Sequence, residues 1–153
     1  HALKYAGHQS LGAALAARLR DHPCLELDDV DVVVPVPLHP WRRLRRGYNQ
    51  AERIARHLGP PVTHVLARAH WTRPQVSLSA EARRHNLRDA FRIAPRLTPR
   101  GRAALLARIR GARILLVDDV VTTGGTLSAC ARVLREAGAR DVRAATAART
   151  LLT

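Results

Sequence analysis

The segment Arg113–Val117, read RILLV, constrains the fold more than any other part of the chain. A continuous run of large apolar residues is typical of a strand that is buried on both faces of a sheet. Two adjacent glycines follow shortly, and apolar residues then recur at helical spacing over Gly125–Ala137, with Gly138 at the expected helix end. A further strand is predicted over Val142–Ala147. This strand–helix–strand order requires a parallel sheet.

The remaining pattern extends this unit into an α/β architecture, with a mostly parallel sheet flanked by helices. We expect one domain over residues 1–153. Apolar periodicity and turn residues predict two further helices, at Gln9–Arg20 and Asn49–Leu58, a buried strand at Asp31–Val36, and short strands at Val62–Ala67 and Phe91–Ile93. Ligands of such sheets bind beyond the carboxyl ends of the strands, so we expect a binding site at the segments after Val36 and Val117.

Basic residues outnumber acidic ones by 26 to 12, giving a formal net charge of +14. This surplus favours phosphate-rich partners, such as nucleotides, pyrophosphate or nucleic acid, without choosing among them. No apolar run approaches the roughly 20 residues that span a bilayer, and no signal segment opens the chain, so we expect a cytoplasmic protein without membrane contact. Cys24 and Cys130 are far apart and the histidines lack ligand spacing, so we expect no metal site made by this chain alone.

The segment Asp118–Thr126, read DDVVTTGGT, lies between the predicted strand and helix. Gly124 and Gly125 allow a tight turn and a close approach of the backbone to a ligand. The N–H groups of the turn and of the helix start point at one spot, where the helix dipole favours an anion. Further donors are the hydroxyls of Thr122, Thr123 and Thr126. The segment predicts a phosphate-binding loop, and it matches neither the nucleoside-triphosphate nor the dinucleotide pattern.

Asp118 and Asp119 would repel a phosphate, so their role must differ from that of the loop. Carboxylates accept hydrogen bonds from vicinal hydroxyls and also help to position Mg²⁺. A phosphate cradle a few residues from two carboxylates therefore predicts a phosphorylated sugar with free hydroxyls as the ligand.

The stretch ILLVDDVVTTGGTL, Ile114–Leu127, resembles the phosphoribosyl-pyrophosphate (PRPP) signature of type I phosphoribosyltransferases. The resemblance implies that family's fold, with a mobile hood loop, and Mg²⁺ bound together with PRPP. It also implies that Asp118 and Asp119 contact the ribose 2- and 3-hydroxyls. The 5-phosphate would be wrapped by Val121, Thr122, Thr123, Gly124, Gly125 and Thr126.

Further blocks are similar to the ComF family of competence-associated proteins, namely HALKYAG near the N-terminus, Val33–Ala55 and Arg73–Phe91. The resemblance implies that the turn after the strand ending near Val36 holds the pyrophosphate, and that Arg73–Phe91 is the hood loop. The residues expected on the pyrophosphate side are Leu38, His39, Arg42, Arg43 and Arg46. The four-cysteine zinc ribbon typical of the family is not among these residues.

These features leave several functions open. The chain could transfer phosphoribosyl from Mg-PRPP to an acceptor nitrogen, with release of pyrophosphate. It could instead be a non-catalytic factor in DNA uptake that binds single-stranded DNA or senses PRPP. In the second case the DNA surface would overlap the basic loop around Arg42–Arg46 or lie elsewhere, on the stretch Arg100–Arg113. A homodimer is one possible assembly.

Overall fold

The computed structural model describes residues 2–38, 47–68, 89–95 and 98–149, with side chains from residue 11 onward. A three-stranded sheet lies at its centre, in the order β1 (Val32–Pro35), β4 (Arg113–Val121) and β5 (Asp141–Arg149). Both strand pairs are parallel, with Pro35 opposite Val117 in the first pair. The predicted parallel sheet is therefore confirmed.

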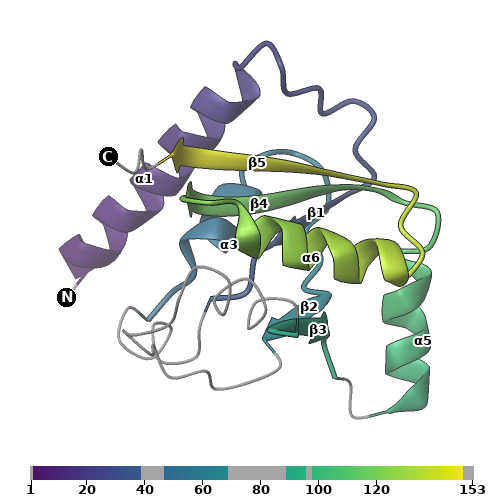
Figure 1. Ribbon diagram of the computed structural model, residues 1–153. Coiled ribbons are helices and arrows are strands. Elements are labelled where there is room, and N and C mark those ends of the chain that lie inside the picture. The colour runs from purple at the N-terminus through teal and green to yellow at the C-terminus, as the bar shows by residue number, and fades with distance from the viewer. Residues whose placement is uncertain (1, 39–46, 69–88, 96–97, 150–153) are drawn as a thin grey trace.

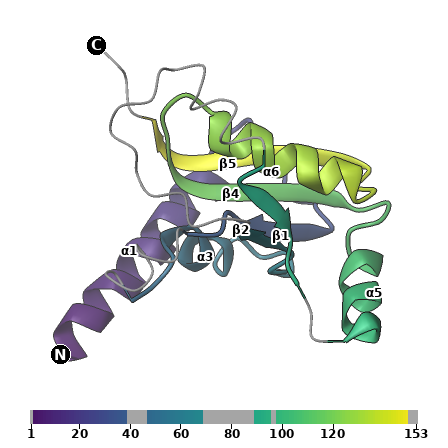
Figure 2. The same ribbon diagram turned by 60° about the horizontal axis from the view of Figure 1, so that its bottom comes forward.

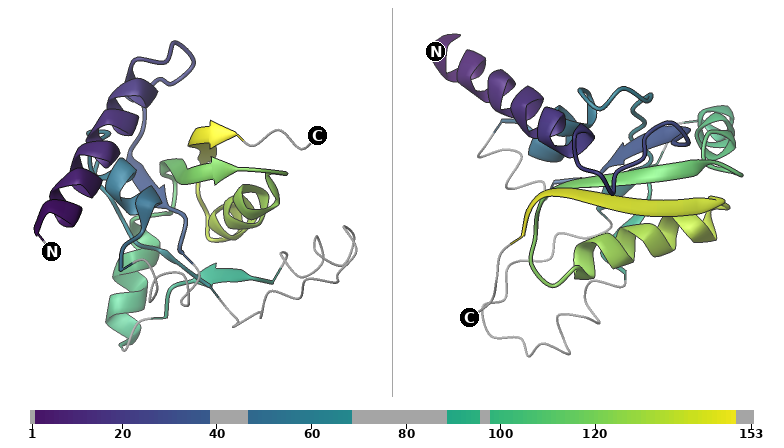
Figure 3. Two further views of the ribbon diagram at one scale, coloured as in Figure 1. Left: turned by 90° about the vertical axis from the view of Figure 1, so that its left-hand side faces the viewer. Right: turned by 90° about the horizontal axis from the view of Figure 1, so that it is seen from above.

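Helices cover both faces of this sheet (Figure 3). One face packs against α6 (Gly125–Glu136), and the other against α1 (Ala2–Arg20) and α3 (Gln50–Ala55). The strands supply both cores because successive side chains point to opposite faces. Ile114 and Leu116 join the core under α6, whereas Leu115 and Val117 join the core under α1 and α3.

Two smaller elements flank the α6 side of the sheet. An antiparallel pair forms from β2 (Leu66–Arg68) and β3 (Phe91–Ile93). The helix α5 (Pro99–Ala107) follows and lies at the end of the sheet where β4 begins (Figure 1). Figure 2 shows the turn from β4 to α6 at the opposite end of the same strand.

Several predicted boundaries were wrong. The first helix begins at Ala2 rather than at Gln9. Of the predicted strand Val62–Ala67, only Leu66 and Ala67 join a ladder, as part of β2, while Val62 forms an isolated bridge to Val33. The predicted strand ending at Val117 continues to Val121, because β5 supplies ladder partners that far. The helix α5 was missed altogether.

The start of α5 nevertheless has an ordinary sequence signal. Thr98 is its N-cap, and the Thr98 hydroxyl accepts a hydrogen bond from the Gly101 N–H at 3.1 Å. Pro99 occupies the first helical turn, where its missing N–H costs nothing. Leu105 and Ile109 are then buried on one side. The apolar spacing was concealed by the arginines of this stretch, Arg100, Arg102, Arg108 and Arg110.

Candidate functional site

The turn between β4 and α6 is the centre of the candidate site. Gly124 is the N-cap of α6 and has φ 77°, a left-handed conformation that favours glycine. No side chain caps this helix, in contrast to α3 and α5, which are capped by Asn49 and Thr98. The first N–H groups of α6 are therefore left without a side-chain acceptor, which suits them to an anion.

The threonines of the turn differ in exposure. Thr122 and Thr123 are exposed, while Thr126 is half-buried in the first turn of α6. Both Gly124 and Gly125 are half-buried. An added Cβ at Gly124 would meet no atom within 4 Å, so the glycine is required for its backbone conformation and not for space. The turn thus presents hydroxyl and backbone donors to the solvent side.

Asp118 and Asp119 lie within β4 and not in the loop, as a result of the longer strand. Each carboxylate accepts a hydrogen bond from the next N–H along the chain: Asp118 from Asp119 at 2.9 Å, and Asp119 from Val120 at 2.8 Å. Both residues are half-buried. These single local bonds leave acceptor capacity on both carboxylates for ligand hydroxyls.

The electrostatic surroundings of Asp118 are unusual. Burial raises the pKa of the Asp118 carboxyl to about 6, and the adjacent Asp119 carboxyl adds to the rise. The Asp119 N–H bond and the charge of Arg68 act in the opposite direction. Burial also raises the pKa of the Cys130 thiol to about 12, with Asp118 contributing, which makes this α6 cysteine an inert core residue. The pKa of the Asp118 carboxyl is therefore well above that of an ordinary aspartate.

The base of the predicted pyrophosphate loop adjoins the carboxylates. The Val36 N–H donates to the Val117 carbonyl at 2.8 Å, which holds the start of that loop beside Asp118. The side chain of Asn49 closes the other end, since its Nδ2 donates to the Val36 carbonyl at 2.9 Å. Its Oδ1 also accepts from the Ala51 N–H at 3.2 Å and caps α3. The predicted meeting of both loops at one sheet edge is thus confirmed at their bases.

Several predicted site residues lie outside the described residues. Leu38 is described and half-buried. The others on the pyrophosphate side fall in the range 39–46, namely His39, Arg42, Arg43 and Arg46. The predicted hood segment Arg73–Phe91 is described only from Asp89 onward.

Sequence reasoning missed an apolar recess of about 150 Å³ beside Asp119. It lies between α1, the start of α3 and the end of β5. Leu11 and Val120 line it and are the exposed large hydrophobic residues of the described part of the chain. Tyr48 also lines it, with the Arg53 guanidinium 4.1 Å from the Tyr48 ring centroid. No periodic signal marks this recess, because its lining comes from four separate segments, which belong to α1, to residues 48–54, to β4 and to β5.

None of the helices that the structure describes is both long and apolar enough to cross a membrane.

Comparison with known proteins identifies the family of the chain. A model of the phosphoribosyl transferase domain matches residues 11–151. Competence protein F of Haemophilus influenzae is 35% identical over 118 residues, covering 74% of this chain and 48% of that protein. The DNA utilization protein YhgH of Salmonella typhimurium is 32% identical over 165 residues, covering 99% of this chain and 66% of that protein. The chain thus spans about half to two thirds of the length of these relatives.

Solved structures support the fold. The glutamine PRPP amidotransferase of B. subtilis, complexed with ADP and GMP, has a TM-score of 0.56 and 23% identity. The match covers 91% of this chain and 26% of that one. The predicted type I phosphoribosyltransferase fold is therefore confirmed. The chain belongs to the phosphoribosyltransferase domain family, among the relatives of competence protein F and the DNA utilization proteins.

Proposed function

We propose that the chain binds PRPP and transfers its phosphoribosyl group to an acceptor nitrogen. The observation that supports this most is the helix α6, which starts from a left-handed glycine without a side-chain cap, a few residues after the two adjacent carboxylates of β4. A phosphate monoester suits the free N–H groups of the helix start. A sugar diol suits the remaining acceptor sites of Asp118 and Asp119.

In this proposal the 5-phosphate and the ribose diol are held at two separate points, which orients C1 of the ribose. The bond between C1 and the pyrophosphate oxygen breaks, and its electron pair leaves on pyrophosphate. The acceptor nitrogen forms the new bond to C1 and loses its proton to solvent. Cationic groups beside the departing pyrophosphate would contribute most of the stabilisation, because charge develops there.

The residues fit the Mg²⁺ that accompanies PRPP in this family. Asp118 and Asp119 offer carboxylate oxygens, the donors that Mg²⁺ prefers, within the strand end that faces the proposed sugar site. When bound, the ion would supply charge neutralisation for the pyrophosphate.

The test of this function has a binding arm and a turnover arm. Calorimetry with Mg-PRPP should show saturable binding, and ribose 5-phosphate should compete for the site because it shares the phosphate and the diol. Release of pyrophosphate is then measured against a panel of nucleobases. Binding without release for any acceptor would retain the site but reject the transfer. Absence of PRPP binding would reject both.

A second candidate function is association with single-stranded DNA. It is supported by the formal charge of +14 and by the names of the relatives, which refer to competence and DNA utilization. Such binding would be independent of base sequence, since it would rest mainly on phosphate contacts. The aromatic content of 3% argues against a stacking platform of the usual kind.

The second function is tested by fluorescence anisotropy with an oligo(dT) of about 20 nucleotides across a salt titration. Each phosphate that the protein neutralises should contribute a slope of about −0.7 in log affinity against log salt. Absence of binding at low salt would reject this function.

A further inference from the structure

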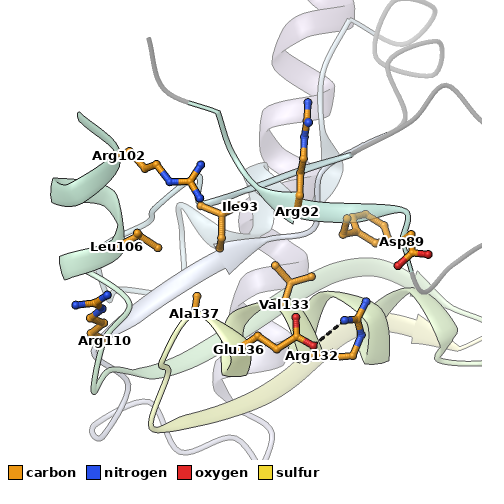
Figure 4. A pocket seen from close by; sticks show the side chains of 11 residues that line it. Asp89, Arg92, Ile93, Arg102, Leu106, Arg110, Arg132, Val133, Glu136 and Ala137 are labelled. Atoms are coloured by element: carbon orange, nitrogen blue, oxygen red, sulfur yellow. Dashed lines mark hydrogen bonds and ion pairs between the residues drawn. The ribbon is translucent and has the colours of Figure 1, made fainter. Parts of the chain in front are cut away.

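A basic groove lies on the opposite side of the domain from the phosphate-binding turn. It has a volume of about 550 Å³ and runs between α5, β3 and the C-terminal half of α6 (Figure 4). Its rim carries four arginines from different elements: Arg92 of β3, Arg102 of α5, Arg110 of the turn after α5, and Arg132 of α6. We call this feature the arginine groove.

The floor of the arginine groove is apolar. Ile93, Leu106, Val133 and Ala137 lie between the charged rims in Figure 4. Val133 is buried, while the other three side chains are partly buried against the core. An apolar floor under a cationic rim is complementary to a ligand with an anionic backbone and flat, weakly polar side groups.

The positive charge of the rim is only partly neutralised. Arg132 pairs with Glu136 at 2.7 Å, and the exposed Asp89 lies at one end of the groove. Within the described ranges, no carboxylate forms an ion pair with Arg92, Arg102 or Arg110.

Nearby arginines outside the groove behave differently. Arg113 pairs with Asp31 at 3.1 Å, and Arg143 pairs with Asp29. The carboxylates at this edge of the sheet therefore neutralise structural arginines and leave those of the groove exposed. All three unpaired groove arginines are exposed, so their guanidinium groups can reach a ligand without a change of fold.

The arrangement of the arginines favours a polymer over a mononucleotide. The phosphates of one nucleotide need cations that converge on a single point, whereas Arg92, Arg102 and Arg110 stand around the groove on separate segments (Figure 4). The successive phosphates of a nucleic-acid strand can each meet one of these cations. The planar guanidinium group also stacks on bases, which reduces the need for aromatic side chains.

The α5 rim of the arginine groove is remote from the phosphate-binding turn. Arg102 and Arg110 precede the first residue of β4, and the turn follows its last residue. The nine residues of β4 place the α5 rim of the groove roughly 25–30 Å from the turn, at about 3.3 Å per residue. Arg132 lies nearer, eight residues after Gly124 on α6, or roughly 12 Å along the helix axis. A strand of DNA held along the α5 rim would therefore leave the PRPP site open.

We propose that the arginine groove binds the backbone of single-stranded nucleic acid, with bases against its apolar floor, independently of PRPP. This rests on the second proposed function and assigns it to one surface. Of the two DNA surfaces considered from the sequence, this proposal favours the stretch Arg100–Arg113 over the basic loop around Arg42–Arg46.

The test compares two variants with equal change of charge. The groove variant is Arg102→Glu with Arg110→Glu, and the control is Arg18→Glu with Arg20→Glu on exposed positions of α1. Binding of oligo(dT) to the whole 153-residue chain is measured by anisotropy. The groove variant should lose more than about tenfold in affinity and about 1.4 in salt slope, while the control loses less than about threefold.

Two further arms identify the ligand. Saturating Mg-PRPP should leave the oligo(dT) affinity of the unmodified chain unchanged. An oligomer with abasic sites should bind more weakly than oligo(dT), because it lacks the bases that contact the apolar floor. Polyglutamate of equal charge should compete poorly. Polyglutamate that competes as well as the oligomer would overturn the proposal in favour of an acidic protein segment.

The outcomes separate the groove from the function on which it rests. Oligo(dT) binding that is equally weakened in both charge variants, or unaffected in the groove variant, would reject the groove while DNA binding itself stands. Failure of the unmodified chain to bind oligo(dT) at low salt would reject both. Circular dichroism and thermal unfolding of each variant establish that lost binding does not come from lost fold.

Discussion

The two ends of β4 present different kinds of hydrogen-bond donor to an anion. Beyond its last residue, the turn at Gly124 offers backbone N–H groups whose positions are set by the helix α6. Before its first residue, the arginine groove offers guanidinium groups on long, exposed side chains. Backbone donors in fixed positions select one compact anion by shape, whereas exposed side chains select charge and tolerate many shapes.

The carboxylates reinforce this difference. Asp118 and Asp119 stand next to the phosphate turn, so an anion without hydroxyl groups is repelled there. Around the arginine groove, Glu136 is paired with Arg132, and Asp31 is paired with Arg113 nearby. The proposed PRPP site should thus be selective and the proposed groove site permissive, and their dependence on mutation, pH and salt should differ.

The largest effect is expected from Asp118→Asn with Asp119→Asn. Each hydrogen bond lost to a charged acceptor costs roughly 1.5–3 kcal/mol, so PRPP affinity should fall by more than about a hundredfold. Pyrophosphate without Mg²⁺ makes neither a diol contact nor a metal contact to these carboxylates, so its affinity should not fall. Calorimetry with both ligands measures this ratio, and an equal loss for both would contradict the proposed contact with ribose.

Gly124→Ala should have the next largest effect. Alanine in a left-handed conformation adds about 1–2 kcal/mol of backbone strain. The turn should relieve this strain by changing its backbone angles, which moves the first N–H groups of α6 away from the phosphate. PRPP affinity should fall by about tenfold or more. The matched control is Gly111→Ala, at φ 73° and equally open, but at the far end of β4. Both variants should lose similar stability in urea, and a similar loss of PRPP affinity would show that strain alone is responsible.

A pH dependence should follow from Asp118. Its folded pKa of about 6 lies above the ordinary value of 3.8, so ionisation opposes folding. The stability that the protonated carboxyl contributes is complete below about pH 3.8 and is lost as the pH rises through about 6. The ionised form is the better acceptor for a diol. Between about pH 5 and pH 7 the ionised fraction rises about tenfold, and PRPP affinity should rise with it.

Asp118→Asn is the control for this pH dependence, because the phosphates of PRPP also titrate in the same range. The difference between the unmodified chain and the variant isolates the carboxyl. Identical pH profiles for the two proteins would assign the titration to the ligand.

The smallest effect is expected for communication between the two regions. Arg102→Glu with Arg110→Glu should change PRPP affinity by less than about twofold. Combined with Asp118→Asn, the losses should add within about 0.5 kcal/mol, because the sites share no partner. A larger coupling in this double-mutant cycle would show that the two ends of β4 act together.

Much of this organisation could be predicted from the sequence. The run Ile114–Val117, the paired glycines and the helix after them are local signals, and the structure confirms each of these elements. The predicted helix Asn49–Leu58 starts at the residue that the structure makes the N-cap of α3. Gly138 ends α6 with φ 98°, as its position predicted.

Other features depend on residues that are distant in sequence. The extension of β4 through Asp118 and Asp119 requires β5 as a hydrogen-bonding partner, with Val120 opposite Ala148. The second role of Asn49, closing the neighbouring loop onto Val36, spans 13 residues and has no local signature.

The phosphate turn and its carboxylates were predictable because they occupy consecutive positions, and consecutive residues keep their relation in any fold. The arginine groove was not, since Arg92, Arg102 and Arg132 become neighbours only when β3, α5 and α6 pack on one core. In the sequence these arginines belong to a general basic excess. Packing and the pairing of nearby carboxylates decide which of them remain available to a ligand, because both depend on long-range contacts that no local pattern encodes.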